Sequence, residues 1–185
     1  MRPKLISLDA LVTMIMALDK QQFAEEYAGF YLLAMGLLSA EQLMEKRAVG
    51  KLATSQESED TQPMTFGEHP HHDLQKAHPL AGHAFHLVPA ERWLKMGRAT
   101  ACDICVPDES VSELHCQIQA AEGGLLVCDL RSTNGTKVNL QRLPVDHAAP
   151  VADGDMLTVG RYSFQLLAAP TLYSTLRLIR ALDNE

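Results

Sequence analysis

The segment "LRSTNGTKVN", at positions 130 to 139, gathers several groups that donate and accept hydrogen bonds. Ser132 and Thr133 supply hydroxyls, Asn134 supplies an amide, and Gly135 follows. Asn-Gly is the strongest short signal for a type I′ turn in a β-hairpin, because both residues tolerate positive φ. The Asn-Gly-Thr triplet also fits the acceptor sequence for N-glycosylation. The segment is therefore a candidate for a hairpin turn, a glycan site or the rim of a binding surface.

Cysteine and histidine side chains raise the possibilities of metal binding and catalysis. Cys102 and Cys105 form a C-x-x-C pair of the kind found in zinc sites. No second pair follows, and Cys116 and Cys128 fall in expected strands, as small core residues do. His115 precedes Cys116, but neighbours on a strand point to opposite faces, which is poor geometry for a nucleophile and its base. We expect no metal, no cofactor, no catalytic residue and hence no enzyme.

Residues 51–82 are polar, rich in histidine and proline, and lack the period of a helix or a strand. Clustered imidazoles can bind zinc, nickel or copper. No helix or strand is expected there to fix the ligand geometry, so we interpret the segment as a linker. A metal site is the alternative. The histidines of this region are His69, His71, His72 and His78, with His83 and His86 just beyond.

Composition narrows the functional classes. The chain has 185 residues, 46% of them hydrophobic and 21% charged, which fits one globular domain with a smaller addition. A net charge of −7 argues against nucleic-acid binding, which needs basic surface. Asp9 interrupts the first apolar stretch, and the run from 28 to 38 is too short to span a membrane. We therefore expect a cytoplasmic protein with reduced thiols, which argues against the glycan site.

Residues 1–50 show helical spacing. Apolar residues recur every three or four positions after Ser7, a suitable N-cap, and a second apolar segment runs from Phe23 to Leu38. Residues 39–42, "SAEQ", have the spacing of a capping box. Short helices cannot bury these side chains alone. They should pair with each other, with the later domain or with a second copy of the chain.

From His83 the sequence changes to short, often alternating runs separated by turn residues. The runs are "HAFHLV", "RWLKMG", "DICV", "HCQIQA", "LLVCDL", "TKVNL", "MLTVG" and "SFQLL". Evenly spaced short strands indicate a sandwich or a barrel. After Pro170, apolar residues step along a last helix, which should pack on the sandwich or on the N-terminal helices.

Four pieces of this β region follow in a distinctive order: "MGR" at 96–98, "SVSELH" at 110–115, "DLRSTNGTKVN" at 129–139 and "VADGDMLTVG" at 151–160. The order resembles the pattern of the forkhead-associated (FHA) domain family: Gly-Arg, then Ser-x-x-His, then Ser/Thr-Asn-Gly-Thr, then Leu/Val-x-x-Gly-Asp. The resemblance covers about residues 83–168. It implies a β-sandwich whose loops at one end bind phosphothreonine peptides.

The resemblance also implies roles for individual residues. Arg98 would pair with the phosphate, Ser112 would donate its hydroxyl to it, and Thr133 would support the same group. Asn134 would hold the main chain of the peptide. Glu113 stands where the family often carries Arg, Lys or Asn, and its carboxylate would repel the phosphate if it pointed inward. Three residues look architectural: Gly97, His115 and Gly135. The second Gly-Arg pair, at 160–161, is expected to face solvent.

The sequence thus predicts a mainly β protein: an FHA-like β-sandwich preceded by a small α-helical region and followed by a short helix. The expected divisions are 1–50 helical, 51–82 linker, 83–168 sandwich and 169–185 helix. The expected function is a non-catalytic adaptor that binds a phosphothreonine-containing protein, a Ser/Thr kinase or its substrate, with self-association through the N-terminal helices. The alternative is an assembly module of the same fold whose protein contacts do not depend on phosphate.

Overall fold

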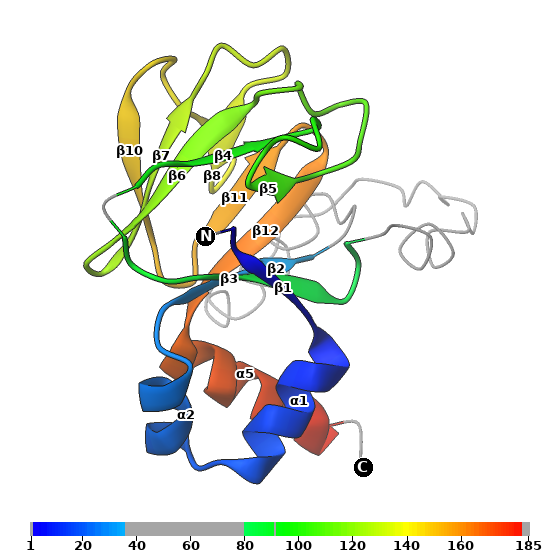
Figure 1. Cartoon of the computed structure of the whole chain (residues 1–185), viewed down its shortest axis with the longest axis vertical. Coiled ribbons are helices and arrows are strands. Elements are labelled where there is room, and N and C mark those ends of the chain that lie inside the picture. Colours follow the sequence, from blue (N-terminus) through cyan, green and yellow to red (C-terminus); the bar gives the residue numbers. More distant parts are fainter. Residues whose placement is uncertain (1, 36–79, 91, 183–185) are drawn as a thin grey trace, which may run out of the picture.

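The computed structural model describes residues 2–35, 80–90 and 92–182. Two β-sheets form a sandwich, and helices cover one end of it (Figure 1). The larger sheet has seven strands in the order β1 (Lys4–Ser7), β3 (His83–Leu87), β2 (Phe30–Ala34), β12 (Tyr162–Ala168), β11 (Met156–Val159), β8 (Thr136–Val138) and β9 (Gln141–Arg142). The smaller has five, in the order β10 (Ala148–Ala152), β7 (Gly124–Asp129), β6 (Cys116–Ala121), β4 (Leu94–Gly97) and β5 (Ile104–Cys105).

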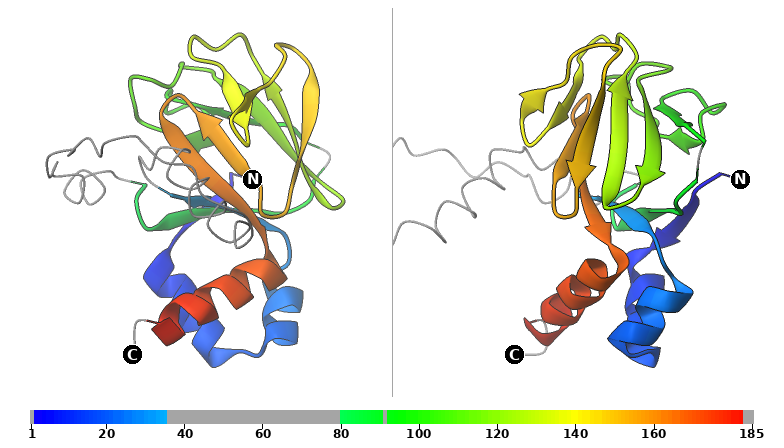
Figure 2. Two further views of the ribbon diagram at one scale, coloured as in Figure 1. Left: turned by 180° about the vertical axis from the view of Figure 1, so that it is seen from behind. Right: turned by 90° about the vertical axis from the view of Figure 1, so that its left-hand side faces the viewer.

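The helices α1 (Leu8–Ala17), α2 (Lys20–Glu26) and α5 (Ala169–Leu182) lie together beyond strands β1 to β3, as Figures 1 and 2 show from three directions. Ser7 caps α1 as expected, since its Oγ accepts from the Ala10 N–H at 3.3 Å. Asp19 and Gln22 form a reciprocal capping box at the start of α2. None of the described helices is long and apolar enough to cross a membrane.

The larger sheet buries side chains on both faces. One face packs against the smaller sheet and the other packs against the helices, so two hydrophobic cores share one sheet. Strand β2 shows this best, because Leu32 points into the first core while Tyr31 and Leu33 point into the second. From α5, Leu172 and Leu176 enter the second core, so the last helix packs with the N-terminal helices as expected.

The expectation of a purely helical N-terminal region is wrong at two places. Residues 30–34, assigned to a helix because they are apolar, form β2, and residues 4–7 form β1. Strand β2 pairs with both β3 and β12, so it is a central strand of the sandwich rather than part of a separate unit. A strand buried on both faces lacks the alternation of polar and apolar residues that identifies a strand in a sequence.

The expected hairpin at Asn134-Gly135 is also wrong. Strands β7 and β8 belong to different sheets, and residues 130–135 carry the chain from one sheet to the other. Gly135 has φ 76°, but Asn134 is absent from the residues with positive φ in the described part of the chain. Two consecutive positive φ angles occur instead at Asn139 and Leu140, which connect the hairpin of β8 and β9.

Each of the eight runs expected as a strand overlaps a strand of the structure, which confirms the mainly β fold. The proposed capping box at 39–42 and the histidines at 69, 71, 72 and 78 lie outside the described residues. Within the described residues, no group of three or more His, Cys, Asp or Glu side chains is arranged to hold a metal ion.

Candidate functional site

The loop between β5 and β6, at residues 110–113, is the point where distant motif residues meet. Arg98 follows the last residue of β4, and its backbone N–H donates to the Ser112 carbonyl at 2.9 Å. The guanidinium Nε of Arg98 donates to the Val111 carbonyl at 3.3 Å. The arginine is thereby held against the loop at two points, while 45% of its side chain stays exposed.

Gly97 allows this close approach. A Cβ at this position would collide with the backbone carbonyl of Glu113, whose carbon would lie 2.9 Å away. Any larger residue would push the end of β4 away from the loop, and Arg98 would move with it. The missing side chain of Gly97 is thus what lets β4 lie against the backbone of Glu113.

Thr133 and Asn134 reach the same loop from the segment that links the two sheets. The backbone N–H of Thr133 donates to Ser112 Oγ at 3.1 Å, and the two hydroxyl oxygens lie 3.4 Å apart. Asn134 Nδ2 donates to the Ser110 carbonyl at 2.7 Å. Thr133 and Asn134 are both exposed and Ser112 is half-buried, so these three polar side chains form one accessible surface beside Arg98.

His115 joins the two loops from beneath. The imidazole is fully buried, its Nδ1 accepts from the Ser112 N–H at 3.1 Å, and its Nε2 lies 3.3 Å from the Gly135 carbonyl. Both bonds are satisfied only by the neutral ring with its proton on Nε2. Burial lowers the pKa of His115, against the opposing effects of the Gly135 carbonyl and the Asp129 carboxylate. The neutral form is thus the one that fits the site.

A buried carboxylate holds the 130–135 segment in place. Asp129 is 1% exposed and accepts from the Ser132 hydroxyl at 2.6 Å, the Thr136 hydroxyl at 2.6 Å and the Ser132 N–H at 3.0 Å. Burial raises the pKa of Asp129, but the hydrogen bonds from Ser132 and Thr136 outweigh it, so the pKa lies below its usual value. The charged carboxylate fixes the segment that presents Thr133 and Asn134.

Glu113 points toward the same surface. Its Oε1 lies 3.8 Å from Arg98 Nη2, and 79% of its side chain is exposed. The carboxylate therefore lies near the arginine but stays exposed to solvent. It is an acidic group at the edge of an otherwise cationic and polar surface.

Sequence reasoning missed the part played by Arg161. Its side chain is 62% exposed, as expected, yet Nε and Nη2 both donate to Asp108 Oδ2, at 2.9 and 2.6 Å. Asp108 Oδ1 in turn accepts from the Ser110 hydroxyl and N–H, and Ser110 Oγ accepts from the Arg161 N–H. Asp108 follows Pro107 in a turn, and nothing in the linear spacing links it to a residue so far along the chain.

Gly160 brings the turn between β11 and β12 against this network. It has φ 59°, and an added Cβ would lie 2.5 Å from Ser110 Oγ and 2.6 Å from the Ser110 carbonyl oxygen. The second Gly-Arg pair is thus a support for the loop that carries Ser112, although it lies outside the contact surface itself.

The C-x-x-C pair also lies beneath the site. Cys102 Sγ donates to the Glu113 carbonyl at 3.2 Å, and Cys105 Sγ lies 3.5 Å from the Arg98 carbonyl. Burial raises the pKa of the Cys102 thiol, and all four cysteines are free thiols. Cys102, Cys116 and Cys128 are buried, while Cys105 is half-buried.

The resulting surface combines one guanidinium, two hydroxyls, one carboxamide and one carboxylate. Guanidinium and hydroxyl groups donate hydrogen bonds to the oxygens of an anion, and charge makes such bonds shorter and stronger. The supporting bonds come from loops anchored in both sheets, so the donors are positioned before a ligand arrives. The arrangement is suited to bind an oxyanion next to an extended main chain.

Comparison with known proteins agrees with this geometry. The family model described as FHA domain matches residues 94–160. The glycogen accumulation regulator GarA of Mycolicibacterium smegmatis is 36% identical over 95 residues, which is 51% of this chain and 57% of that protein. An FHA domain-containing protein of Arabidopsis thaliana is 29% identical over 86 residues, 46% of this chain and 22% of that protein. The chain therefore spans less than two thirds of either relative.

Two solved structures are also similar. One comes from a structural and functional analysis of phosphothreonine-dependent FHA domain interactions, with 29% identity and a TM-score of 0.42 over 47% of this chain and 85% of that chain. The other is the FHA domain of the CT664 protein from Chlamydia trachomatis, with 26% identity and a TM-score of 0.43 over the same shares. The sandwich and the order of the four motifs agree with this family match: over residues 94–160 the chain is similar to the FHA domain family.

Proposed function

We propose that this protein binds phosphothreonine peptides through Arg98, Ser112, Thr133 and Asn134, and that it does so without catalysis. The observation that carries the proposal is that two segments distant in sequence bond to one loop: Thr133 lies against the Ser112 hydroxyl, and the Arg98 guanidinium donates to the neighbouring Val111 carbonyl. A phosphate monoester carries close to two negative charges and three acceptor oxygens, which match these donors.

Each residue has a separate part in the proposed complex. Arg98 supplies the positive charge and can meet two phosphate oxygens at once. Ser112 and Thr133 add hydrogen bonds whose direction is set by the loops. The Asn134 carboxamide uses Nδ2 on Ser110 and leaves its oxygen available for a peptide N–H. Such a division separates recognition of the phosphate from recognition of the peptide backbone.

Glu113 favours the alternative of an assembly module that ignores phosphate, because it already lies near Arg98. The energy of the Arg98–Glu113 contact, compared with that of bonds to a phosphate, nevertheless supports phosphate binding. A pair at 3.8 Å between two largely exposed side chains is worth about 0–1 kcal/mol. A phosphate dianion that accepts several charge-assisted bonds displaces such a contact, since each bond to a charged group contributes about 1.5–3 kcal/mol.

Isothermal titration calorimetry with a phosphothreonine peptide library tests the proposal. We expect phosphate-dependent binding by the wild-type protein and loss of at least about tenfold in affinity for Arg98→Ala, which corresponds to about 1.4 kcal/mol. Ser112→Ala should weaken binding and lower the thermal midpoint of unfolding only slightly, because it also removes the bond from the exposed Thr133 N–H to Ser112 Oγ. Arg177→Ala, in the exposed part of α5, is the matched control and should bind as the wild type does. Equal affinity for phosphorylated and unphosphorylated peptides would favour the assembly module.

At the level of the cell, we propose a cytoplasmic adaptor whose ligand is made by a Ser/Thr kinase, with the helices α1, α2 and α5 as the surface for a partner or a second copy. Met16, Leu178 and Ile179 are exposed apolar residues of this helical layer. Analytical ultracentrifugation at increasing protein concentration tests self-association. If the molar mass stays at that of the monomer, and Leu178→Glu does not change it, self-association is contradicted.

A further inference from the structure

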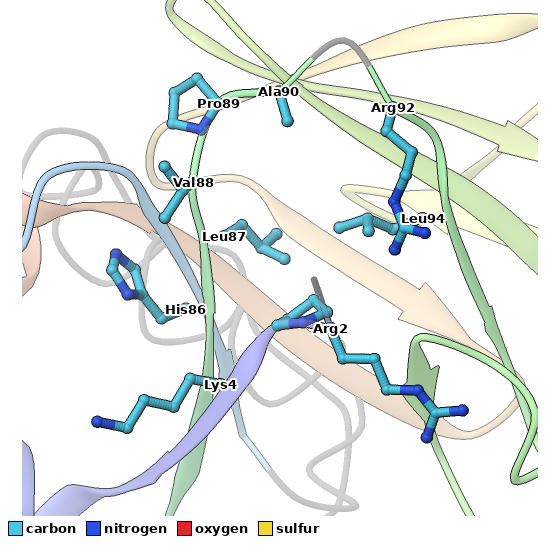
Figure 3. Close-up of a pocket in the computed structure, with 10 residues that line it drawn as sticks. Arg2, Lys4, His86, Leu87, Val88, Pro89, Ala90, Arg92 and Leu94 are labelled. Carbon is cyan, nitrogen blue, oxygen red and sulfur yellow. The ribbon is translucent and has the colours of Figure 1, made fainter.

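A cavity of about 480 Å³ lies between β1 and the segment that leads from β3 to β4 (Figure 3). Its walls are mostly apolar and include Leu87, Val88 and Leu94. A space of this size accepts a small ligand or a large side chain. Neither the proposed phosphate site nor the FHA motif residues contribute to it.

Positive charge surrounds this apolar space. Arg2, Lys4 and Arg92 are among its lining residues, and the Arg92 side chain points toward Leu94 in Figure 3. No described residue that lines it carries a carboxylate. Asp103, close by, accepts from Arg92 Nη2 at 2.5 Å and from the Lys95 N–H at 2.9 Å, and so holds Arg92 in position. Among the described residues, three cations face one neighbouring carboxylate, which leaves an excess of positive charge in this part of a chain whose net charge is −7.

The sheet next to the cavity ends in β1. In the sheet order β1 pairs with β3 on one side and is the outermost strand on the other. An outermost strand offers backbone groups to an extended peptide. Leu5 of this strand and Val88 of the cavity wall are 43% and 59% exposed, so apolar surface continues from the strand to the cavity.

The cavity is separate from the phosphate site. Strand β4 begins with Leu94, in the cavity wall, and ends with Gly97, next to Arg98. Four residues of strand span roughly 10 Å between the first and last Cα. A ligand in the cavity therefore leaves Arg98 and the 110–113 loop accessible.

From these contacts we infer a second docking site on this protein, which binds an acidic segment of a partner protein: an apolar side chain of the segment fills the cavity and neighbouring carboxylates pair with Arg2 and Lys4. Charge complementarity selects the acidic segment, and the apolar walls select a leucine-sized or larger side chain within it. This binding requires no phosphate.

Nuclear magnetic resonance titration of the ¹⁵N-labelled full chain tests the inference, with a synthetic peptide that has one central leucine and three Asp or Glu residues on each side. We expect saturable shifts of the backbone amides of residues 2, 4, 5, 86–88, 90 and 92–94, and an affinity that falls as salt rises. Replacing the acidic residues by Asn and Gln, or the leucine by Gly, should weaken binding at least about fivefold, which corresponds to about 1 kcal/mol.

Variants of the protein localise the site. Arg2→Gln and Val88→Glu should each weaken the acidic peptide at least about threefold and leave the affinity for a phosphothreonine peptide unchanged, so the two proposals fail separately. Both positions are exposed, so folding is retained. The matched controls are Arg142→Gln and Val145→Glu, which make the same kinds of change at exposed positions outside the cavity lining and should bind the acidic peptide as the wild type does. Equal binding of the neutral peptide, shifts confined to residues 98–134, or binding to phosphatidylserine vesicles without binding to the peptide would overturn the inference.

Discussion

The guanidinium of Arg98 and the carboxylate of Glu113 lie 3.8 Å apart on the exposed edge of the loop between β5 and β6. The pair places an acidic group where an anionic ligand is proposed to bind. We therefore expect Glu113 to lower the affinity for a phosphorylated ligand, because the ligand must displace the carboxylate from Arg98.

Glu113→Gln is therefore expected to strengthen phosphothreonine-peptide binding. Loss of an exposed ion pair of about 0.2–1 kcal/mol corresponds to about a 1.5- to 5-fold gain in affinity. Calorimetry at low and high salt measures it, and the gain should shrink as salt screens the carboxylate. Glu122→Gln, at the tip of the β6–β7 hairpin, is the matched control. An unchanged or weaker affinity for Glu113→Gln would show that the carboxylate does not oppose the ligand.

Arg161 is expected to act as a positioning residue. Arg161→Gln removes the two bonds to Asp108 and leaves a carboxylate that is 3% exposed with Ser110 as its remaining partner among the bonds described. We expect about a three- to tenfold loss of phosphopeptide affinity, because the Ser110–Ser112 loop loses its support. Arg161→Lys keeps the positive charge, so it should retain part of the phosphopeptide affinity that Arg161→Gln loses. In a double-mutant cycle with Asp108→Asn, additive losses would contradict the coupling.

His115 should make stability depend on pH. Its pKa in the folded protein lies below the value of about 6.5 for an unfolded chain, so the unfolded chain takes up the proton first as the pH falls. The contribution of His115 to the free energy of unfolding is then complete above about pH 6.5 and is lost as the pH falls toward the lower folded pKa. Denaturant titrations between pH 7.5 and pH 5 check this. We expect the free energy of unfolding to fall as the pH is lowered through this range.

His115→Gln should remove this pH dependence and destabilise the protein at pH 7.5 by about 1–3 kcal/mol, because the buried Ser112 N–H or the Gly135 carbonyl loses its partner. If the wild type and the variant lose stability in parallel from pH 7.5 to pH 5, another group is responsible.

Strand β2 should be required for folding of the sandwich. A chain that starts at residue 83 lacks the strand between β3 and β12, and its loss exposes both cores at once. We expect no cooperative unfolding transition by circular dichroism. A second variant, in which a Gly/Ser linker of about ten residues replaces 36–79, should fold, because Leu33 and Ala84 are register partners and need only a short connection. A folded chain from residue 83 would show that β2 is dispensable.

The motif residues could be predicted from the sequence because each lies in a short linear pattern, and the structure brings Arg98, Ser112, Thr133 and Asn134 to one loop. Arg161 and Asp108 could not be paired in this way, since their contact depends on how the β11–β12 turn meets a loop formed by residues around position 110. Long-range pairing of this kind leaves no local signal.

The errors in the fold have a common physical source. Residues 30–34 are apolar at every position because helices cover one face of β2 and the smaller sheet covers the other. Gly29, with φ 125°, is the one local sign that the preceding helix has ended. Asn134-Gly135 has the residues of a hairpin turn, but the next strand joins the opposite sheet, a choice made by packing rather than by turn chemistry.

The central place of β2 also affects how the protein is made. Ala34 pairs with Phe164 and Phe30 pairs with Ala168, so one neighbour of β2 is synthesised at least 130 residues later. At about 5–20 residues per second, a ribosome needs roughly 7 to 26 seconds to reach that neighbour. During this time an aromatic and aliphatic segment, "FYLLA", has left the ribosome without its partner strand. We therefore expect nascent chains of this protein to bind chaperones that shield apolar segments during translation.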